Sequence, residues 1–89
     1  PHATAEVALV HNGIIENFKP LRDALVARGR RFESETDTEV VAHLVSEQVE
    51  AGKSPEDAVK AVLPQLRGAF ALAIAFRQQP GLLIGARLG

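Results

Sequence analysis

The sequence predicts an α+β fold in which helices pack on one face of a β-sheet. The run from Phe70 to Phe76 alternates large and small apolar residues with period two, which is typical of a β-strand. Three other segments carry apolar residues at helical spacing, each between a polar start and a glycine. The expected order of elements is β-α-(β)-α-α-β-β, and a mixed order of this kind places the helices on one side of the sheet.

The first half of the chain is expected to contain a strand, a helix and a second short strand. The apolar run Val7–Val10 indicates a buried strand, and His11-Asn12-Gly13 after it indicates a turn. A helix is expected from Asn17 to Arg28, with Asn17 as its N-cap and Gly29 directly after its end. Residues Arg31–Glu33 are the candidate for the short strand.

Two further helices are expected before the clear strand. Thr36 and Glu39 have the spacing of a capping box, in which each side chain bonds the backbone of the other residue. That helix should close at Gly52, and Ser54 should cap the next one, which ends by Gly68. Proline at position 64 removes a backbone hydrogen bond, so the last turn should bend or leave α geometry.

A hairpin should close the fold. The segment 78–81 (QQPG) indicates a turn, and Leu82–Ala86 should return as an antiparallel strand beside Phe70–Phe76. Both faces of the Phe70–Phe76 strand are apolar, so both should be covered. The large side chains should pack on helices, and the alanine face should allow another layer to approach closely.

Composition narrows the function classes. The chain has 89 residues, enough for one small domain, and 46% are hydrophobic. A net charge of −1 provides no basic field for nucleic acid or an anionic membrane surface. No apolar run reaches the roughly 18 residues that a membrane span needs. The chain has no cysteine and its three histidines lack a ligand spacing, so no disulfide framework or metal site is expected. A cytoplasmic location fits this composition.

Two short segments could carry chemistry. The amide of Asn12 and the unhindered N–H of Gly13 could form an oxyanion hole, but the same dipeptide is common in turns. Asp37, at a helix start, could bind an ammonium group, but an acid there also interacts well with the helix dipole. Taken alone, these residues favour the turn and the capped helix start. His11 is expected to be packed or hydrogen-bonded and His43 to be half-exposed, and neither is assigned a catalytic role.

Taken together, the segments resemble a known family. HNGIIEN (11–17), SETDTEV (34–40), PQLRGAFALA (64–73) and the final ARLG (86–89) resemble the glutaminase domain of glucosamine-6-phosphate synthase, a class II glutamine amidotransferase with the N-terminal-nucleophile hydrolase fold. The opening Pro1-His2 resembles the end of the family's NAHPH segment. The resemblance implies a four-layer αββα sandwich, of which this chain supplies part. It implies L-glutamine as substrate and no metal or organic cofactor.

The resemblance also implies roles for particular residues. Asn12 and Gly13 match the oxyanion-hole pair, which stabilises the intermediate formed when the glutamine carboxamide is attacked. Asp37 matches the acid that holds the α-ammonium group of the substrate. Thr36 and Glu39 would then keep the start of that helix rigid.

Essential parts of the family's site are absent from these 89 residues. The family's nucleophile is an N-terminal cysteine, whereas residue 1 here is proline and the chain has no cysteine. The segment that binds the glutamine carboxylate and the sugar-isomerase domain are also absent. Both ends of the sequence look like internal positions, so residues 1–89 are expected to be an inner fragment that is inactive alone.

Two alternatives remain. Another class II amidotransferase, such as amidophosphoribosyltransferase or asparagine synthetase, would keep the HNG segment. A non-catalytic interaction module of the same fold would need no cysteine. For an inner fragment, the doubly apolar strand at 70–76 predicts that the isolated chain self-associates through an uncovered sheet face or edge.

Overall fold

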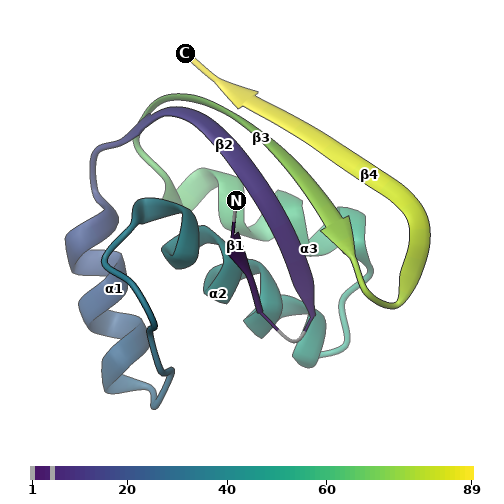
Figure 1. The fold of residues 1–89 in the computed structure, drawn as a ribbon, viewed down its shortest axis with the longest axis horizontal. Coiled ribbons are helices and arrows are strands. Elements are labelled where there is room, and N and C mark those ends of the chain that lie inside the picture. The colour runs from purple at the N-terminus through teal and green to yellow at the C-terminus, as the bar shows by residue number, and fades with distance from the viewer. Residues whose placement is uncertain (1, 5) are drawn as a thin grey trace.

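The computed structural model describes residues 2–4 and 6–89, which form one antiparallel sheet with helices on one face (Figure 1). Pro1, on which part of the NAHPH resemblance rests, lies outside the described residues. The sheet has the order β1-β2-β3-β4, and the three helices lie between β2 and β3 in the sequence. The strands are β1 (His2–Ala3), β2 (Val7–Ile15), β3 (Gly68–Phe76) and β4 (Gln79–Leu88). The helices are α1 (Phe18–Ala27), α2 (Asp37–Glu50) and α3 (Pro55–Val62), and α3 continues into a short 3₁₀ turn (Leu63–Gln65).

The α+β class is confirmed, but the order of elements differs from the expectation in two places. The strand β1 was not expected, and Arg31–Glu33 is not a strand. The Phe32 ring packs against the His43 ring, with 4.4 Å between centroids. The backbone N–H of Glu33 donates to the Glu39 carboxylate at 2.8 Å, so it is not available to a neighbouring strand. The observed order is therefore β-β-α-α-α-β-β.

The turn expected at His11-Asn12-Gly13 is wrong, because β2 continues through it to Ile15. The three residues pair with the first half of β3. Their Cα partners are Leu72, Ala71 and Phe70. Polar residues do not break this strand because alternate side chains point to opposite faces of the sheet. The imidazole of His11 points to the helices, and Asn12 lies on the other face.

Two glycines allow β2 and β3 to approach closely. Gly13 and Gly68 have positive φ angles of 99° and 129°. A Cβ atom on Gly13 would lie 2.3 Å from the carbonyl oxygen of Ala69, and one on Gly68 would lie 2.2 Å from that of Ile14. Both distances are too short for any side chain. Gly68 was expected to end the third helix, but it is the first residue of β3.

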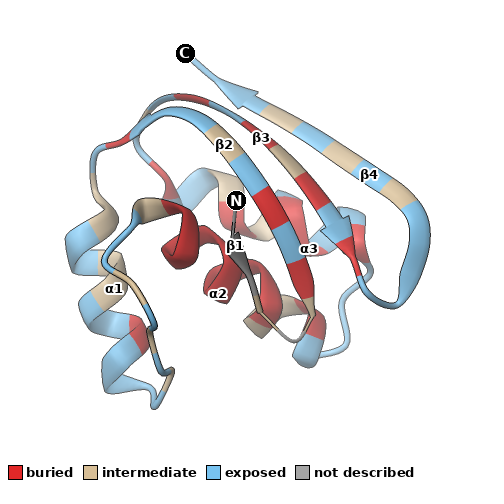
Figure 2. Cartoon of the chain, viewed as in Figure 1, coloured by how far each residue is buried: buried red, intermediate tan, exposed pale blue. Residues whose placement is uncertain are grey.

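The hydrophobic core lies between the sheet and the helices (Figure 2). The large side chains of β3 are buried there, as expected from the period-two pattern. Helix α2 lies at the centre, and ten of its residues are buried. The most deeply buried apolar residues of the core include Ile15, Leu25, Val40, Val41, Val45, Ala58, Val62 and Ile74.

The opposite face of the sheet has no cover within the described residues. Four alanines of β3, at positions 69, 71, 73 and 75, alternate with the buried residues and line this face. Three large apolar side chains from β2 and β4 surround them. Their exposed fractions are 48% for Val10, 69% for Ile14 and 66% for Leu83. The hairpin of β3 and β4 is antiparallel, as expected, with a register shift at Ala75/Phe76.

The ends of the helices follow the sequence signals in part. Ser54 caps α3 through the Asp57 amide at 3.2 Å, and Pro64 lies in the 3₁₀ turn, so both expectations are confirmed. Asn17 is wrong as a side-chain N-cap. Its amide instead donates to the Gln65 carbonyl at 2.8 Å and accepts from the Arg67 N–H at 2.9 Å. This side chain therefore ties the end of β2 to the start of β3.

Candidate functional site

Asn12 and Gly13 line an open groove of about 460 Å³ at one end of the uncovered sheet face. The facing wall comes from β3 and from the end of the chain. Those residues are Ala69, Phe70, Ala71, Arg87, Leu88 and Gly89. Ala71 is the Cα partner of both Asn12 and Arg87, so the small alanine separates an amide from a guanidinium across the sheet. The structure thus brings together the two residues expected to donate hydrogen bonds.

Arg87 is the residue of this groove that sequence reasoning missed as a candidate. It was noted only as part of the final ARLG segment. Arg87 lies at the groove because Asn12, Ala71 and Arg87 are neighbours across β2, β3 and β4. The one signal in the sequence was the hairpin itself, which fixes Arg87 near the start of β3 once the turn is placed.

Asp37 is the first residue of α2, and it lies on the helix side of the sheet. Its Oδ2 atom accepts a hydrogen bond from the backbone N–H of Ile15 at 3.4 Å, and it lies 3.3 Å from Nε2 of His11. The Asp37 side chain is 21% exposed. A partly exposed carboxylate can bind a cation, and the positive end of the helix dipole stabilises the charged form of the carboxylate itself.

Asp37 does not line the groove that contains Asn12 and Gly13. Strand β2 connects the Asp37 contact with the groove. His11 points to the helix side of β2, and the next residue, Asn12, points to the open side. One nitrogen of the His11 ring is hydrogen-bonded to the hydroxyl of Thr38, and the other lies within ion-pair distance of Asp37. The expectation that His11 is hydrogen-bonded is confirmed.

The segment before Asp37 is held by a buried carboxylate. Glu39 is 1% exposed. It accepts hydrogen bonds from the Glu33 N–H at 2.8 Å, the Ser34 N–H at 2.7 Å and the Ser34 hydroxyl at 2.6 Å. Burial raises the pKa of Glu39, but these bonds and a further one to His43 outweigh it and lower that pKa to about 2.

The capping box expected from Thr36 and Glu39 is only half formed. The Thr36 hydroxyl accepts from the Glu39 N–H at 3.4 Å, as expected. The Glu39 carboxylate bonds the amides of residues 33 and 34 instead of returning to Thr36. This arrangement fixes a longer stretch of backbone than a capping box does, and that stretch leads directly into Asp37.

His43 is buried, at 7% exposure, so the expected half-exposure is wrong. Its ring accepts a hydrogen bond from Arg30 at 3.0 Å, lies 3.3 Å from Glu39 and packs on Phe32. Arg30 and Arg28 also form ion pairs with α2, at 2.9 Å to Glu50 and 2.8 Å to Glu47. Both arginines therefore bind acidic side chains of α2.

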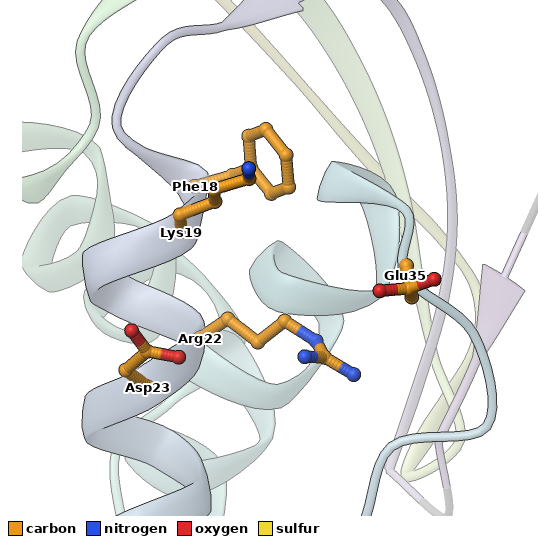
Figure 3. Close-up of a pocket in the computed structure, with 5 residues that line it drawn as sticks. All are labelled: Phe18, Lys19, Arg22, Asp23 and Glu35. Atoms are coloured by element: carbon orange, nitrogen blue, oxygen red, sulfur yellow. The ribbon is translucent and has the colours of Figure 1, made fainter.

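A second hollow of about 420 Å³ lies between α1 and the segment before α2 (Figure 3). Figure 3 shows Phe18, Lys19, Arg22 and Asp23 on α1, with Glu35 across the hollow. The guanidinium of Arg22 lies 4.9 Å from the centre of the Phe32 ring. Two cations and two carboxylates line the hollow, so its charge favours no ligand of one sign. None of these residues was a candidate from the sequence.

The described residues include no group of three or more potential ligands placed to hold a metal ion. No helix among residues 2–4 and 6–89 has the length and apolar character that crossing a membrane requires.

Comparison with known proteins identifies the family. The family described as glutamine amidotransferase domain matches residues 1–87. The chain belongs to this family. Curated relatives of this amidotransferase domain are named glutamine–fructose-6-phosphate aminotransferase (isomerizing). The protein of Zymomonas mobilis is 70% identical and that of Brucella abortus is 62% identical, each over 100% of this chain. The chain spans 15% of the length of these relatives.

Solved structures support the fold of the amidotransferase domain. The glutamine phosphoribosylpyrophosphate amidotransferase of B. subtilis matches 79% of this chain and 15% of its own, with a TM-score of 0.71 and 36% identity. A structure described as the allosteric regulatory enzyme of purine biosynthesis matches 82% of this chain and 16% of its own, with a TM-score of 0.72 and 34% identity. The mixed helix and antiparallel-sheet arrangement is therefore that of known amidotransferases.

Proposed function

We propose that residues 1–89 are an internal part of the glutaminase domain of an enzyme that makes glucosamine 6-phosphate from fructose 6-phosphate and L-glutamine. The observation that carries the proposal is the 70% identity to a glutamine–fructose-6-phosphate aminotransferase over every residue of the chain. The nucleophilic cysteine, the carboxylate-binding segment and the sugar-isomerase domain would be supplied by sequence outside these residues. The proposed location is cytoplasmic.

In this proposal Asn12 and Gly13 form the oxyanion hole. Attack on the glutamine carboxamide moves negative charge onto its oxygen, and preorganised amide donors stabilise that charge. The side chain of Asn12 and the N–H of Gly13 are such donors, and both residues line one groove. The positive φ of Gly13 and its close approach to the Ala69 carbonyl require glycine, so no side chain stands beside its N–H.

Asp37 is the proposed contact for the α-ammonium group of glutamine. Its role is charge complementarity, and it carries no proton during the reaction. The support is its partly exposed carboxylate at the start of α2 and the rigid backbone before it, which Glu39 holds. A rigid first turn lowers the entropy lost when the ligand binds.

The missing layers of the proposed αββα sandwich would cover the open sheet face. The alanines of β3 leave room for a second sheet to approach that face. Since no element of the described residues covers Ile14 and Leu83, that second sheet would bury both side chains. This deepens the open groove into an enclosed site, where hydrogen bonds to a developing charge are stronger.

The first experiment measures glutamate release from glutamine, with and without fructose 6-phosphate, for this chain and for the full-length gene product. The chain should be inert, and the full-length product should be active and stimulated by the sugar phosphate. Substituting Asn12→Ala should lower kcat by about 100-fold or more. The matched control is Gln78→Ala in the exposed turn between β3 and β4, which should leave kcat unchanged.

Other outcomes assign the chain elsewhere. Glutamate release that responds to phosphoribosylpyrophosphate but not to fructose 6-phosphate would favour an amidophosphoribosyltransferase, the activity named for the B. subtilis structure. A full-length product that releases no glutamate would overturn the proposal and leave the interaction-module hypothesis.

A further inference from the structure

We infer that His11 is a positioning residue for Asp37 and thereby sets the selectivity for a substrate with an α-ammonium group. The inference rests on the proposed function, because it takes Asp37 as the ammonium contact. It assigns a role to a residue that the sequence left without one.

The first step is the geometry of the His11 ring. The ring lies between β2 and the start of α2, and its side chain is 14% exposed. Nε2 lies 3.3 Å from Oδ2 of Asp37, and Nδ1 is hydrogen-bonded to the hydroxyl of Thr38. Both ring nitrogens are therefore engaged by consecutive residues of one helix turn, which fixes the orientation of the ring.

The second step is the direction of the hydrogen bonds. A carboxylate accepts only, so the 3.3 Å contact with Asp37 is favourable when the nitrogen that faces it carries a proton. In a neutral ring with that proton on Nε2, Nδ1 has a free lone pair, and the Thr38 hydroxyl can donate to it. The contacts with Asp37 and with Thr38 are therefore compatible with the same tautomer. This is the arrangement in which a histidine ring holds a carboxylate in place without competing for its charge.

The third step concerns which oxygen of Asp37 is used. Oδ2 accepts a hydrogen bond from the Ile15 N–H and lies 3.3 Å from Nε2 of His11. Among the described residues no donor is seen on Oδ1. Both of these groups come from β2 and contact the same oxygen, so β2 orients the carboxylate and leaves the other oxygen available to a cation.

The fourth step links this contact to the oxyanion pair. His11 is the residue directly before Asn12, and the alternation of β2 places the two side chains on opposite faces. The His11 ring can therefore be removed on the helix side without removing a group from the groove that Asn12 and Gly13 line.

The test uses the full-length gene product with two substrates, glutamine and glutaramate, which is glutamine without its α-amino group. His11→Ala should lower kcat/KM for glutamine by about 10-fold, the size of one lost polar contact with a charged group. The loss should lie in KM, with kcat retained. The kcat/KM for glutaramate should stay unchanged, because that substrate has no ammonium group to place.

Two further variants separate positioning from a general structural effect. His11→Gln places an amide N–H near the position of Nε2 and should restore most of the glutamine activity. In an Asp37→Asn background, His11→Ala should have no further effect on glutamine, because coupled residues are not additive.

Several results would overturn the inference. One is an equal loss of kcat/KM for both substrates in His11→Ala, which indicates a damaged fold. Another is an additive effect of the two substitutions. A third is a His11→Ala enzyme with wild-type kcat/KM for glutamine. The proposed function fails separately, by a wild-type product that releases no glutamate from glutamine.

Discussion

Replacing Glu39 with glutamine tests how the start of α2 is held. Glutamine has the same shape, but one acceptor oxygen becomes an NH₂ group that faces backbone donors. The carboxylate accepts from the amides of Glu33 and Ser34 and from the Ser34 hydroxyl, and it is almost fully buried. At least one of these donors loses its acceptor in Glu39→Gln, and a buried donor without an acceptor is costly.

The magnitude follows from the pKa of Glu39. The carboxyl has a reference pKa of 4.5, and the folded structure lowers it to about 2. That difference corresponds to about 3 kcal/mol of preference for the charged form in the folded state. The loss of one or two hydrogen bonds to a charged group gives a similar figure, about 3 kcal/mol. Glu39→Gln should therefore weaken the local structure by this amount.

Amide hydrogen exchange of the full-length gene product is the assay, because it reports opening of this segment alone. The protection of the Glu33 and Ser34 amides should fall by about 100-fold in Glu39→Gln. The control is Glu47→Gln, which breaks the more exposed ion pair with Arg28 and should change protection by less than about 1 kcal/mol. Equal protection in Glu39→Gln and wild type would refute the reasoning.

Three further outcomes are expected. The pKa of Glu39 is lower in the folded state, so its carboxylate stabilises the fold fully above pH 4.5 and progressively less as the pH falls toward 2. In Glu39→Gln, the unfolding free energy measured by urea titration should therefore depend less on pH across that range. Gly13→Ala should cost at least about 2 kcal/mol in the same titration, whereas Gly85→Ala, whose Cβ would lie 3.9 Å from its nearest neighbour, should be close to neutral. Light scattering should show that the isolated chain self-associates. Leu83→Lys on the open sheet face should reduce this association, and Val26→Lys on α1 should not. A monodisperse wild-type monomer would contradict the prediction.

The sequence predicted the helices and the hairpin well because their signals are local. Ser54 with Pro55 gives the start of α3, and Pro64 gives the change to 3₁₀ geometry. The period-two pattern of Phe70–Phe76 correctly predicted which side chains face the helices. Each of these features depends on residues within one or two turns or along one strand, so no tertiary knowledge was needed.

The failures come from contacts between distant residues. The His11-Asn12-Gly13 segment has turn composition, but pairing with β3 keeps it extended. Arg31–Glu33 has strand composition, but the buried carboxylate of Glu39 takes its N–H group. The burial of His43 depends on Phe32 and Arg30, which the sequence does not place beside it.

The candidate site was predicted residue by residue, and its arrangement was not. The resemblance pointed to Asn12, Gly13 and Asp37, whose roles remain predictions. The partnership of His11 with Asp37 and Thr38 has no sequence signature, because it joins a mid-strand residue to the start of a helix. The position of Arg87 likewise depends on strand register.

The pairing of Ile15 with Gly68 has a consequence for how the protein is made. All three helices are synthesised between the two strands that meet there. On the ribosome, the groove beside Asn12 cannot form until Ala69 and Ala71 have emerged, although Asn12 emerged much earlier. The segment that contains the three helices must therefore be closed into a loop when β2 pairs with β3. The entropy lost in closing so long a loop makes this pairing a late, slow event in folding.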